Sequence, residues 1–236
     1  MKILTLIAGV LALLLLILSG PLYQAEILGL MNAFLAMRIA LIVGAVAIVL
    51  ALIQVIFMRK TISWPVTGVA VFCAAVAILM PLSMMNKAKS VPPIHDITTD
   101  LVNPPKFVAI LPLRADAPNP AEYQGEEIAK QQRVAYPELQ TQKYQKTTEQ
   151  VFDAALAAVK NMGLEMVNSD KSLGLIEAYD TTTFFGFVDD VVIRIQSDGQ
   201  ITKLDARSKS RIGKSDIGKN AERLNTLIAG IKNNLN

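Results

Sequence analysis

Three long apolar runs fill most of the first 85 residues, whereas the pattern of the remainder mixes apolar and polar positions as in a water-soluble domain. The runs cover about residues 3–22, 39–57 and 66–82, lengths that suit helices crossing the roughly 30 Å hydrocarbon core of a bilayer. Charged residues are rare here and are confined to Lys2, Glu26, Arg38, Arg59 and Lys60. We therefore expect residues 1–85 to form a membrane region of three transmembrane helices.

The first apolar run has an alternative interpretation, because a lysine followed by an aliphatic stretch also resembles a secretory signal peptide. A cut after Ala25 would place the bulky side chain of Tyr23 where a small residue is expected. We therefore favour a helix that stays in the protein over a peptide that is removed.

The short loops predict an orientation. Arg59 and Lys60 lie between the second and third runs and Lys2 precedes the first, so the positive-inside tendency places all three in the cytoplasm. Residues from about 86 onward would then lie outside, although Lys87 and Lys89 count against this orientation. We expect an integral protein of the plasma (inner) membrane whose C-terminal domain is periplasmic where two membranes are present.

Residues 86–145 are rich in proline, with pairs at positions 92–93 and 104–105 and further prolines at 112, 118 and 120. Proline removes backbone donors and forces the preceding residue into extended conformations, which argues against a long helix. The apolar stretch Phe107–Leu111 indicates packing against a core. We expect an ordered extended wrap with short strands, the alternative being a free linker.

Residues 146–236 show the pattern of a compact domain. Thr147 and Gln150 have the spacing of a capping box, and a helical apolar face follows as far as Gly163. Strand-like segments come next at about 164–167, 175–183 and 187–196, and another follows the turn at Asp198-Gly199. With a last helix, the fold class is α+β, a two-layer α/β sandwich with an antiparallel sheet of about four strands and two helices.

The Asp198-Gly199 turn predicts a hairpin register, because this dipeptide favours a two-residue loop. Ser197 would then pair with Gln200. The same register gives the pairs Val191 with Ala206, Ile193 with Leu204, Ile195 with Thr202, Asp190 with Arg207 and Arg194 with Lys203. Leu204, Ala206, Ser208, Ser210 and Ile212 would point to the core, and the charged residues between them would point away.

Gly213 ends the last strand, and we expect Ser215 or Asp216 to cap the helix that follows. Gly213-Lys214-Ser215 resembles part of a P-loop, but Ser208 stands where that motif needs glycine and the preceding strand belongs to a hairpin. Arg211, Lys214 and the helix start would suit an anionic group, although Asp216 offers its own carboxylate to that position.

Composition excludes several kinds of site. Cys73 lies in the third apolar run, so the domain has no disulfide framework and no thiol nucleophile. His95 is the only histidine, which excludes metal sites built on several histidines. The net charge of +3 is small and is no nucleic-acid signature. We expect no metal, no cofactor and no nucleic-acid partner.

One constellation suggests a pocket, because Asp189 should face inward beside Ser208 and Ser210. A structural role, in which hydroxyl groups or helix-end amides satisfy a buried carboxylate, is the simpler interpretation. The candidate ligand-binding residues are Asp189, Asp190, Arg194, Arg207, Ser208, Ser210, Arg211, Lys214, Ser215, Asp216 and Asn220. No residue is assigned a catalytic role.

Several stretches in order, "PPIHDITTD", "NPPKF", "YP", "VDDVVIRI" and "DARSKSRIGKSDIGKNAERL", resemble the bacterial and chloroplast family called domain of unknown function 1499. The resemblance covers about residues 90–234. It implies a membrane-anchored protein of the cell envelope or thylakoid lumen, and it supplies no catalytic residue because the activity of that family is unassigned.

We expect a non-enzymatic membrane protein whose external domain binds a partner protein or an anionic ligand such as a lipid headgroup. An envelope enzyme of hydrolase type is one alternative, and it would use Asp189, Ser208, Ser210 and Arg211. An accessory subunit of a larger membrane complex is the other.

Overall fold

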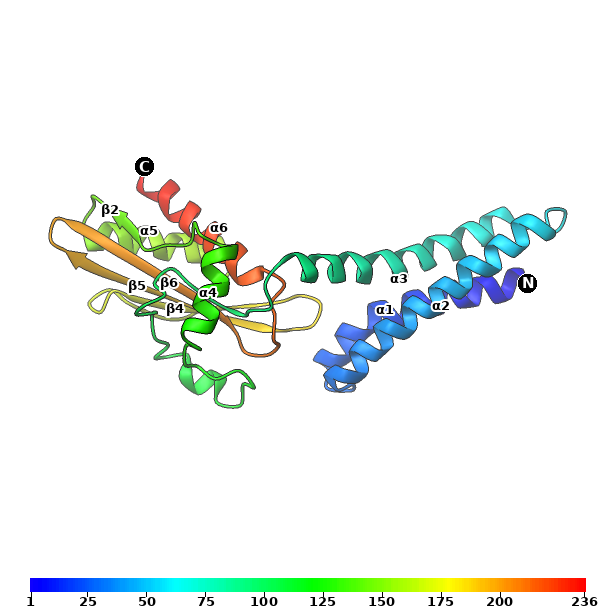
Figure 1. The fold of residues 1–236 in the computed structure, drawn as a ribbon, viewed down its shortest axis with the longest axis horizontal. Helices are drawn as coiled ribbons and strands as arrows, with labels where there is room; N and C mark the ends of the chain where they lie inside the picture. The colour runs from blue at the N-terminus through cyan, green and yellow to red at the C-terminus, as the bar shows by residue number, and fades with distance from the viewer. The chain divides into compact units, whose positions relative to one another are not determined.

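The computed structural model describes residues 1–236 and separates into two compact units (Figure 1). The helical unit consists of Met1–Lys87 together with the short segment Thr183–Gly186. The sheet domain consists of Ala88–Thr182 and Phe187–Asn236. Each unit is described by itself.

The helical unit holds three helices long and apolar enough to cross a membrane, which confirms the three expected from the sequence. They are α1 (Lys2–Gln24), α2 (Leu30–Phe57) and α3 (Trp64–Ser90). Helix α2 begins well before the expected residue 39, because the segment from Leu30 to Arg38 contains neither proline nor glycine to delay it. Helix α3 continues past Pro81 through a polar last turn.

Small side chains line the contacts between these helices, and large aliphatic side chains point outward. On α2 the buried positions recur at alternating spacings of four and three residues: Ala33, Met37, Ala40, Gly44, Ala47, Ala51 and Gln54. A Cβ atom on Gly9 of α1 would lie 2.4 Å from the Ala70 carbonyl oxygen of α3. Such residues let helix backbones approach closely in lipid, where apolar burial alone gives no driving force.

The sheet domain contains one antiparallel sheet of six strands in the order β1-β6-β5-β4-β3, with β2 also paired to β6. The strands are β1 (Asp96–Thr98), β2 (Gln142–Tyr144), β3 (Glu165–Asp170), β4 (Leu175–Thr181), β5 (Val188–Asp198) and β6 (Ile201–Ser210). The structure confirms the predicted α+β class, but the expected count of about four strands is too low. The additional strands β1 and β2 come from the proline-rich segment and each have three residues.

Helices α5 (Thr148–Asn161) and α6 (Lys219–Leu235) pack with one face of the sheet around a shared apolar core. The capping box of Thr147 and Gln150 at the start of α5 is confirmed. Helix α6 begins after Gly218 rather than directly after Ser215 or Asp216, and Ile217 lies outside the helix with φ 56°. Asp216 nevertheless accepts the Asn220 N–H at 2.6 Å, so it satisfies one free amide of the first turn.

The opposite face of the sheet is covered by the segment between β1 and α4, residues 99–125, which we call the wrap. Phe107 and Ile110 of the wrap pack against Val192 of β5, and η1 (Leu111–Arg114) is a short 3₁₀ turn within it. Because the wrap covers this face, Asp205, Arg207 and Lys209 of β6 point away from the apolar core, as expected, but are buried.

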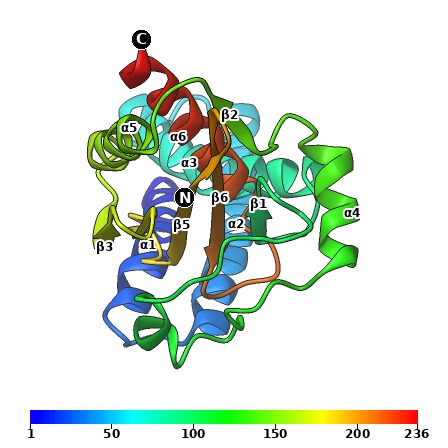
Figure 2. The same ribbon diagram turned by 90° about the vertical axis from the view of Figure 1, so that its left-hand side faces the viewer.

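Helix α4 (Glu126–Ala135) is a correction to the expected irregular segment 86–145. It fits between Pro120 and Pro137, where the sequence offers enough residues free of proline. Helix α4 lies beside β1 at the edge of the sheet (Figure 2). The Gln132 side chain accepts the Thr98 N–H at 3.1 Å and donates to the Thr98 carbonyl at 2.6 Å. It thus satisfies the two backbone groups of this edge residue that a neighbouring strand would otherwise bind.

The register predicted for the β5–β6 hairpin is wrong by two residues. Ser197 pairs with Thr202 and Asp198 pairs with Ile201, so the loop is Gly199-Gln200 rather than Asp198-Gly199. Gly199 has φ 65°, as the first loop position of a type II′ turn requires. Moving the loop by one residue preserves which side chains share a face, and it places Arg194 directly opposite Asp205.

We predict unequal costs for two glycine substitutions with the same backbone conformation. Gly174 and Gly199 have φ of 62° and 65°, but a Cβ atom on Gly174 would lie 2.1 Å from the Ile195 carbonyl oxygen, whereas nothing lies within 4 Å at Gly199. Gly199→Ala should cost about 1–2 kcal/mol of unfolding free energy, and Gly174→Ala about 1–3 kcal/mol more. Thermal unfolding of the full chain in detergent measures the difference, and equal melting temperatures would contradict this packing.

His95 generates a second prediction, because it is buried at the end of the sheet with Nε2 lacking a partner. Burial, helped by the positive charge of Lys209, lowers the pKa of His95 below its ordinary value of 6.5. Between the lowered pKa and 6.5 the unfolded chain therefore binds a proton that the folded chain does not. Stability should fall as pH drops through this window, with a slope of at most about 1.4 kcal/mol per pH unit.

The matched measurement compares urea unfolding of the natural chain and of His95→Gln at pH 7.5 and at pH 5.5. Because His95 is the only histidine, the substitution should flatten this part of the pH dependence while carboxylate contributions stay common to both proteins. If the free energy of unfolding changes between the two pH values by the same amount in both proteins, His95 is not held neutral in the folded chain.

Candidate functional site

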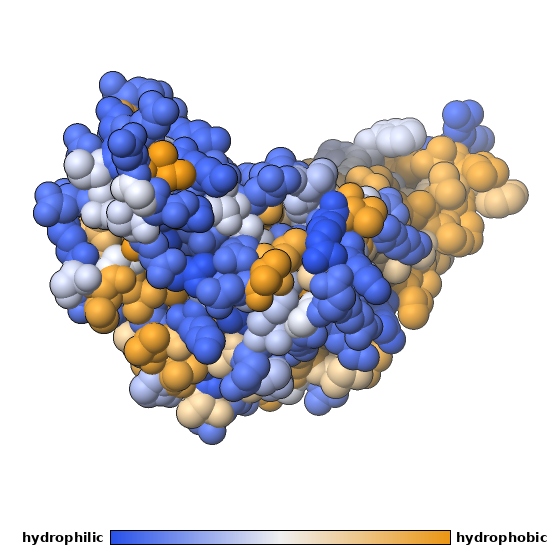
Figure 3. Space-filling model, turned by 60° about the vertical axis from the view of Figure 1, so that its left-hand side comes forward, coloured by the Kyte–Doolittle hydropathy of each residue, from blue (hydrophilic) through white to orange (hydrophobic).

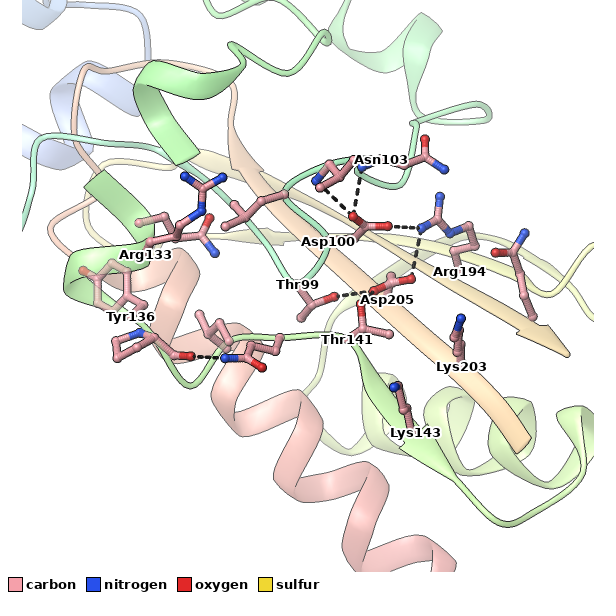
Figure 4. Close-up of a pocket in the computed structure, with 17 residues that line it drawn as sticks. Thr99, Asp100, Asn103, Arg133, Tyr136, Thr141, Lys143, Arg194, Lys203 and Asp205 are labelled. Carbon is pink, nitrogen blue, oxygen red and sulfur yellow. Dashed lines mark hydrogen bonds and ion pairs between the residues drawn. The ribbon is translucent and has the colours of Figure 1, made fainter. Parts of the chain in front are cut away.

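A pocket of about 720 Å³ opens on the wrap side of the sheet domain, at the edge where β2 joins β6 (Figure 4). Four parts of the chain contribute to it: the residues after β1, the end of α4 with the loop that follows, β2, and the neighbouring parts of β5 and β6. The charged residues in its lining are Asp100, Arg133, Lys143, Arg194, Lys203 and Asp205.

Arg194 joins two carboxylates in this pocket, with Nη2 3.0 Å from Asp100 Oδ2 and 3.0 Å from Asp205 Oδ2. The second oxygen of Asp205 accepts hydrogen bonds from the hydroxyls of Thr99 and Thr141, at 3.1 and 2.6 Å. Asp100 Oδ1 accepts the backbone N–H groups of residues 102 and 103, at 3.0 and 2.9 Å. Each carboxylate thus already accepts three hydrogen bonds, out of about four that its lone pairs allow.

Cationic side chains also line this pocket. Lys143 on β2 and Lys203 on β6 are directly opposite each other in the register. Lys203 forms an ion pair with Asp198 at 2.7 Å, whereas no hydrogen bond or ion pair joins the Lys143 ammonium to the rest of the chain. Arg133 pairs with Glu126 at 2.7 Å, outside the lining. Of the four cationic residues in the lining, Lys143 is therefore the one without a carboxylate partner.

A different cluster lies buried beneath the wrap. Asp96 of β1 forms ion pairs with Arg207 Nε and with Lys209 Nζ, both at 2.8 Å. None of these three side chains is more than 2% exposed. Burial lowers the pKa of Lys209, and the neighbouring Asp96 carboxylate opposes that change. Nearby, Asp190 forms ion pairs with Arg114 at 2.9 Å and with Arg211 at 2.7 Å.

A third cluster joins the helix side of the sheet to the start of α6. Asn220 accepts from the Ser208 hydroxyl at 2.6 Å and donates to the Ser210 hydroxyl at 3.0 Å. Arg223, one turn further along α6, donates to Asp189 at 2.8 Å. These groups satisfy one another in the interior, and Asp189 is 3% exposed. Helix α6 thus covers the Asp189 constellation.

The turn before α6 holds the remaining sequence-predicted residues. The Ser215 hydroxyl accepts the Ile217 N–H at 3.2 Å, and Asp216 accepts the N–H groups of Gly218 and Asn220 at 2.8 and 2.6 Å. Burial raises the pKa of Asp216, and these amide donors oppose the increase. Lys214 is exposed, and its carbonyl lies 3.4 Å from His95 Nδ1.

The structure therefore distributes the predicted residues over four places. The cluster under α6 contains Asp189, Ser208, Ser210 and Asn220, the cluster under the wrap contains Asp190, Arg207 and Arg211, the turn contains Lys214, Ser215 and Asp216, and only Arg194 lines the pocket. The expected pairs of Asp190 with Arg207 and of Arg194 with Lys203 are wrong, because the register pairs Asp190 with Lys209 and Arg194 with Asp205. Ligand binding by these residues stays a prediction.

Sequence reasoning missed Asp100, Lys143 and the role of Asp205 in the pocket. Lys143 belongs to β2, a strand of three residues that carries too short an alternation to be recognised. The one available signal was "DLVN" at 100–103, an aspartate placed to accept amide hydrogens two and three residues later, as in an Asx-turn.

A comparison with protein families agrees with the sequence resemblance. A comparison with curated proteins finds no match to this chain. Residues 96–231, more than half of the chain, match the family described as "Protein of unknown function (DUF1499)". This range lies inside the predicted region 90–234 and includes the whole sheet and its buried ionic clusters. The chain belongs to the DUF1499 family.

Proposed function

We propose that this protein is a membrane-anchored binding protein whose sheet domain holds an anionic ligand in the pocket beside β2. The observation that carries the proposal is the pair Lys143 and Lys203, two like charges placed directly opposite each other on the pocket lining. Like charges in this arrangement destabilise a sheet. A bound anion between the two ammonium groups would turn that repulsion into attraction.

The other pocket groups favour the same ligand charge. The Asp100 and Asp205 carboxylates are both ion-paired with Arg194 and accept further hydrogen bonds from neighbouring donors, so a bound cation would have to compete with Arg194. Lys143 and the side-chain amide of Asn103 offer donors that no group of the chain accepts. A site with spare donors and mostly occupied acceptors suits phosphate or carboxylate.

The size of the pocket supports a phosphate-bearing headgroup. Its volume of about 720 Å³ lies within the range of about 300–1,000 Å³ typical of small-molecule sites. The chain also carries three helices suited to a membrane, which supplies phospholipid at high local concentration. We therefore propose a lipid headgroup as the ligand, held by the domain outside the cytoplasm.

The alternative of an envelope hydrolase has less geometric support. Asp189, Ser208 and Ser210 are covered by α6 and hydrogen-bonded within the cluster, and Arg211 binds Asp190 on the other side of the sheet. The pocket lining contains no serine, cysteine or histidine. The Thr99 and Thr141 hydroxyls of the pocket do donate to Asp205, but Asp205 is also ion-paired with Arg194, which favours the charged carboxylate and makes it a weak base.

We predict that inorganic phosphate and glycerol phosphate bind the full chain in neutral detergent, whereas glycerol does not. The double variant Lys143→Met with Lys203→Met should weaken binding by at least about tenfold, since a hydrogen bond to a charged group contributes about 1.5–3 kcal/mol. Isothermal titration at low salt measures both affinities. Phosphate alone binding as tightly as glycerol phosphate would identify a free anion, rather than a headgroup, as the ligand.

The matched control is the double variant Lys160→Met with Lys232→Met, which removes the same charge from exposed positions on α5 and α6. It should bind like the natural chain. An equal loss in both double variants would mean that general electrostatic attraction, rather than the pocket, holds the anion, and would refute the proposed site.

The proposed orientation gives a separate prediction. In a Cys73→Ala background, Ser172→Cys in the turn between β3 and β4 should react with a membrane-impermeant maleimide in spheroplasts. Thr61→Cys between α2 and α3 should react only after the membrane is permeabilised. Both positions are exposed, so the reverse pattern would place the sheet domain in the cytoplasm.

A further inference from the structure

The wrap displays a row of exposed apolar side chains on an otherwise mainly polar domain. Val108, Leu111 and Leu113 are 59%, 45% and 51% exposed, and Pro112 between the two leucines is also exposed. We call Val108 and Leu111–Leu113 the apolar knob. Apolar side chains form separate patches on the largely hydrophilic surface of the sheet domain (Figure 3). Consecutive exposed apolar residues are disfavoured unless they serve a function.

The fold holds this knob rigidly outward. Ile110 and Arg114, which flank the exposed residues Leu111–Leu113, are 0% and 5% exposed. Arg114 forms an ion pair with Asp190 at 2.9 Å. The Glu177 carboxylate accepts the N–H groups of residues 108 and 109, both at 2.7 Å. Buried ionic groups therefore fix the backbone so that the apolar side chains face away from the domain.

The knob lies at one defined end of the sheet. Arg211, which follows β6, donates from Nη1 to the Leu113 carbonyl at 2.7 Å. The Arg211 N–H donates to the carbonyl of Val188, the first residue of β5, at 2.9 Å. The knob is thus attached where β5 begins and β6 ends, opposite the end that carries the Gly199-Gln200 loop.

The chain is linked to the helical unit at this same end. It enters the sheet domain at Ala88, shortly before His95, and the His95 carbonyl accepts the N–H of Ser210, the last residue of β6, at 3.0 Å. It leaves again between β4 and β5, because Thr183–Gly186 belongs to the helical unit. Both links come from the end of the sheet that carries the knob.

We propose that the apolar knob is a membrane-contact surface, and that Val108, Leu111 and Leu113 enter the interfacial region of the lipid bilayer in which the helices are anchored. Two covalent links join this end of the sheet to the helical unit, so the chain itself limits how far the knob can move from the membrane. Lys106, exposed just before the knob, can remain at the level of anionic headgroups. This surface lies apart from the pocket beside β2 and does not depend on ligand binding there.

Fluorescence quenching tests this proposal in the full chain reconstituted into bilayers. Trp64 is the only tryptophan, so a Trp64→Phe background lets an introduced indole be observed alone. The variant Leu111→Trp should lose most of its emission when the lipids carry bromine at the upper acyl positions, because interfacial apolar groups lie about 5–10 Å deep at the headgroup and acyl boundary. Val108→Trp should behave in the same way and provides a second variant if the first misfolds.

The matched control is Leu173→Trp, an exposed leucine in the turn between β3 and β4 at the other end of the sheet. Its emission should be unaffected by brominated lipid. The proposal is overturned if the knob variants are quenched no more than this control. It is equally overturned if their emission shifts to the blue without quenching, since protein, such as a second copy or a partner, would then cover the knob.

Discussion

One buried carboxylate, that of Asp96, is the centre of the ionic contacts that join β1, β6 and the wrap. It lies between Arg207 and Lys209 on the neighbouring strand β6 and pairs β1 with that strand. The same two cations also reach the wrap, Arg207 through the carbonyls of Pro105 and Ala121 and Lys209 through that of Glu122. Removing one partner of a buried ion pair costs about 3–5 kcal/mol. Loss of Asp96 would leave both cations without their carboxylate partner in the interior.

The proline-rich sequence of the wrap explains why this side of the sheet is ionic. Proline has no N–H, and an irregular segment cannot form a regular ladder, yet its buried carbonyl oxygens still need donors. Arginine and lysine supply several donors each. Arg114 binds the carbonyls of residues 119 and 120, and Arg211 binds that of Leu113. The four cations Arg114, Arg207, Lys209 and Arg211 thus act as hydrogen-bond donors to a segment that cannot join the sheet.

This arrangement also shows how far sequence patterns could lead. The alternation along β5 and β6 correctly separated the face of Leu204 and Ala206 from the face of Arg207 and Lys209, because side-chain parity survives a shift of two in register. Alternation could not show that the second face is covered, since the covering wrap lies about a hundred residues earlier in the sequence. Lys209 was therefore expected to point away from the core, whereas it is fully buried. The pocket could not be predicted from the sequence for the same reason, since its lining comes from four segments that are far apart along the chain.

The inward-facing surfaces of the three N-terminal helices have a further consequence. The residues buried between α1, α2 and α3 are mostly alanine and glycine, with a few polar side chains such as Thr5 and Gln54, which hydrogen-bond to each other. No aspartate, glutamate, lysine, arginine or histidine is buried there. Contact among these three helices therefore depends on small side chains and on the hydrogen bond between Gln54 and Thr5, rather than on buried charge.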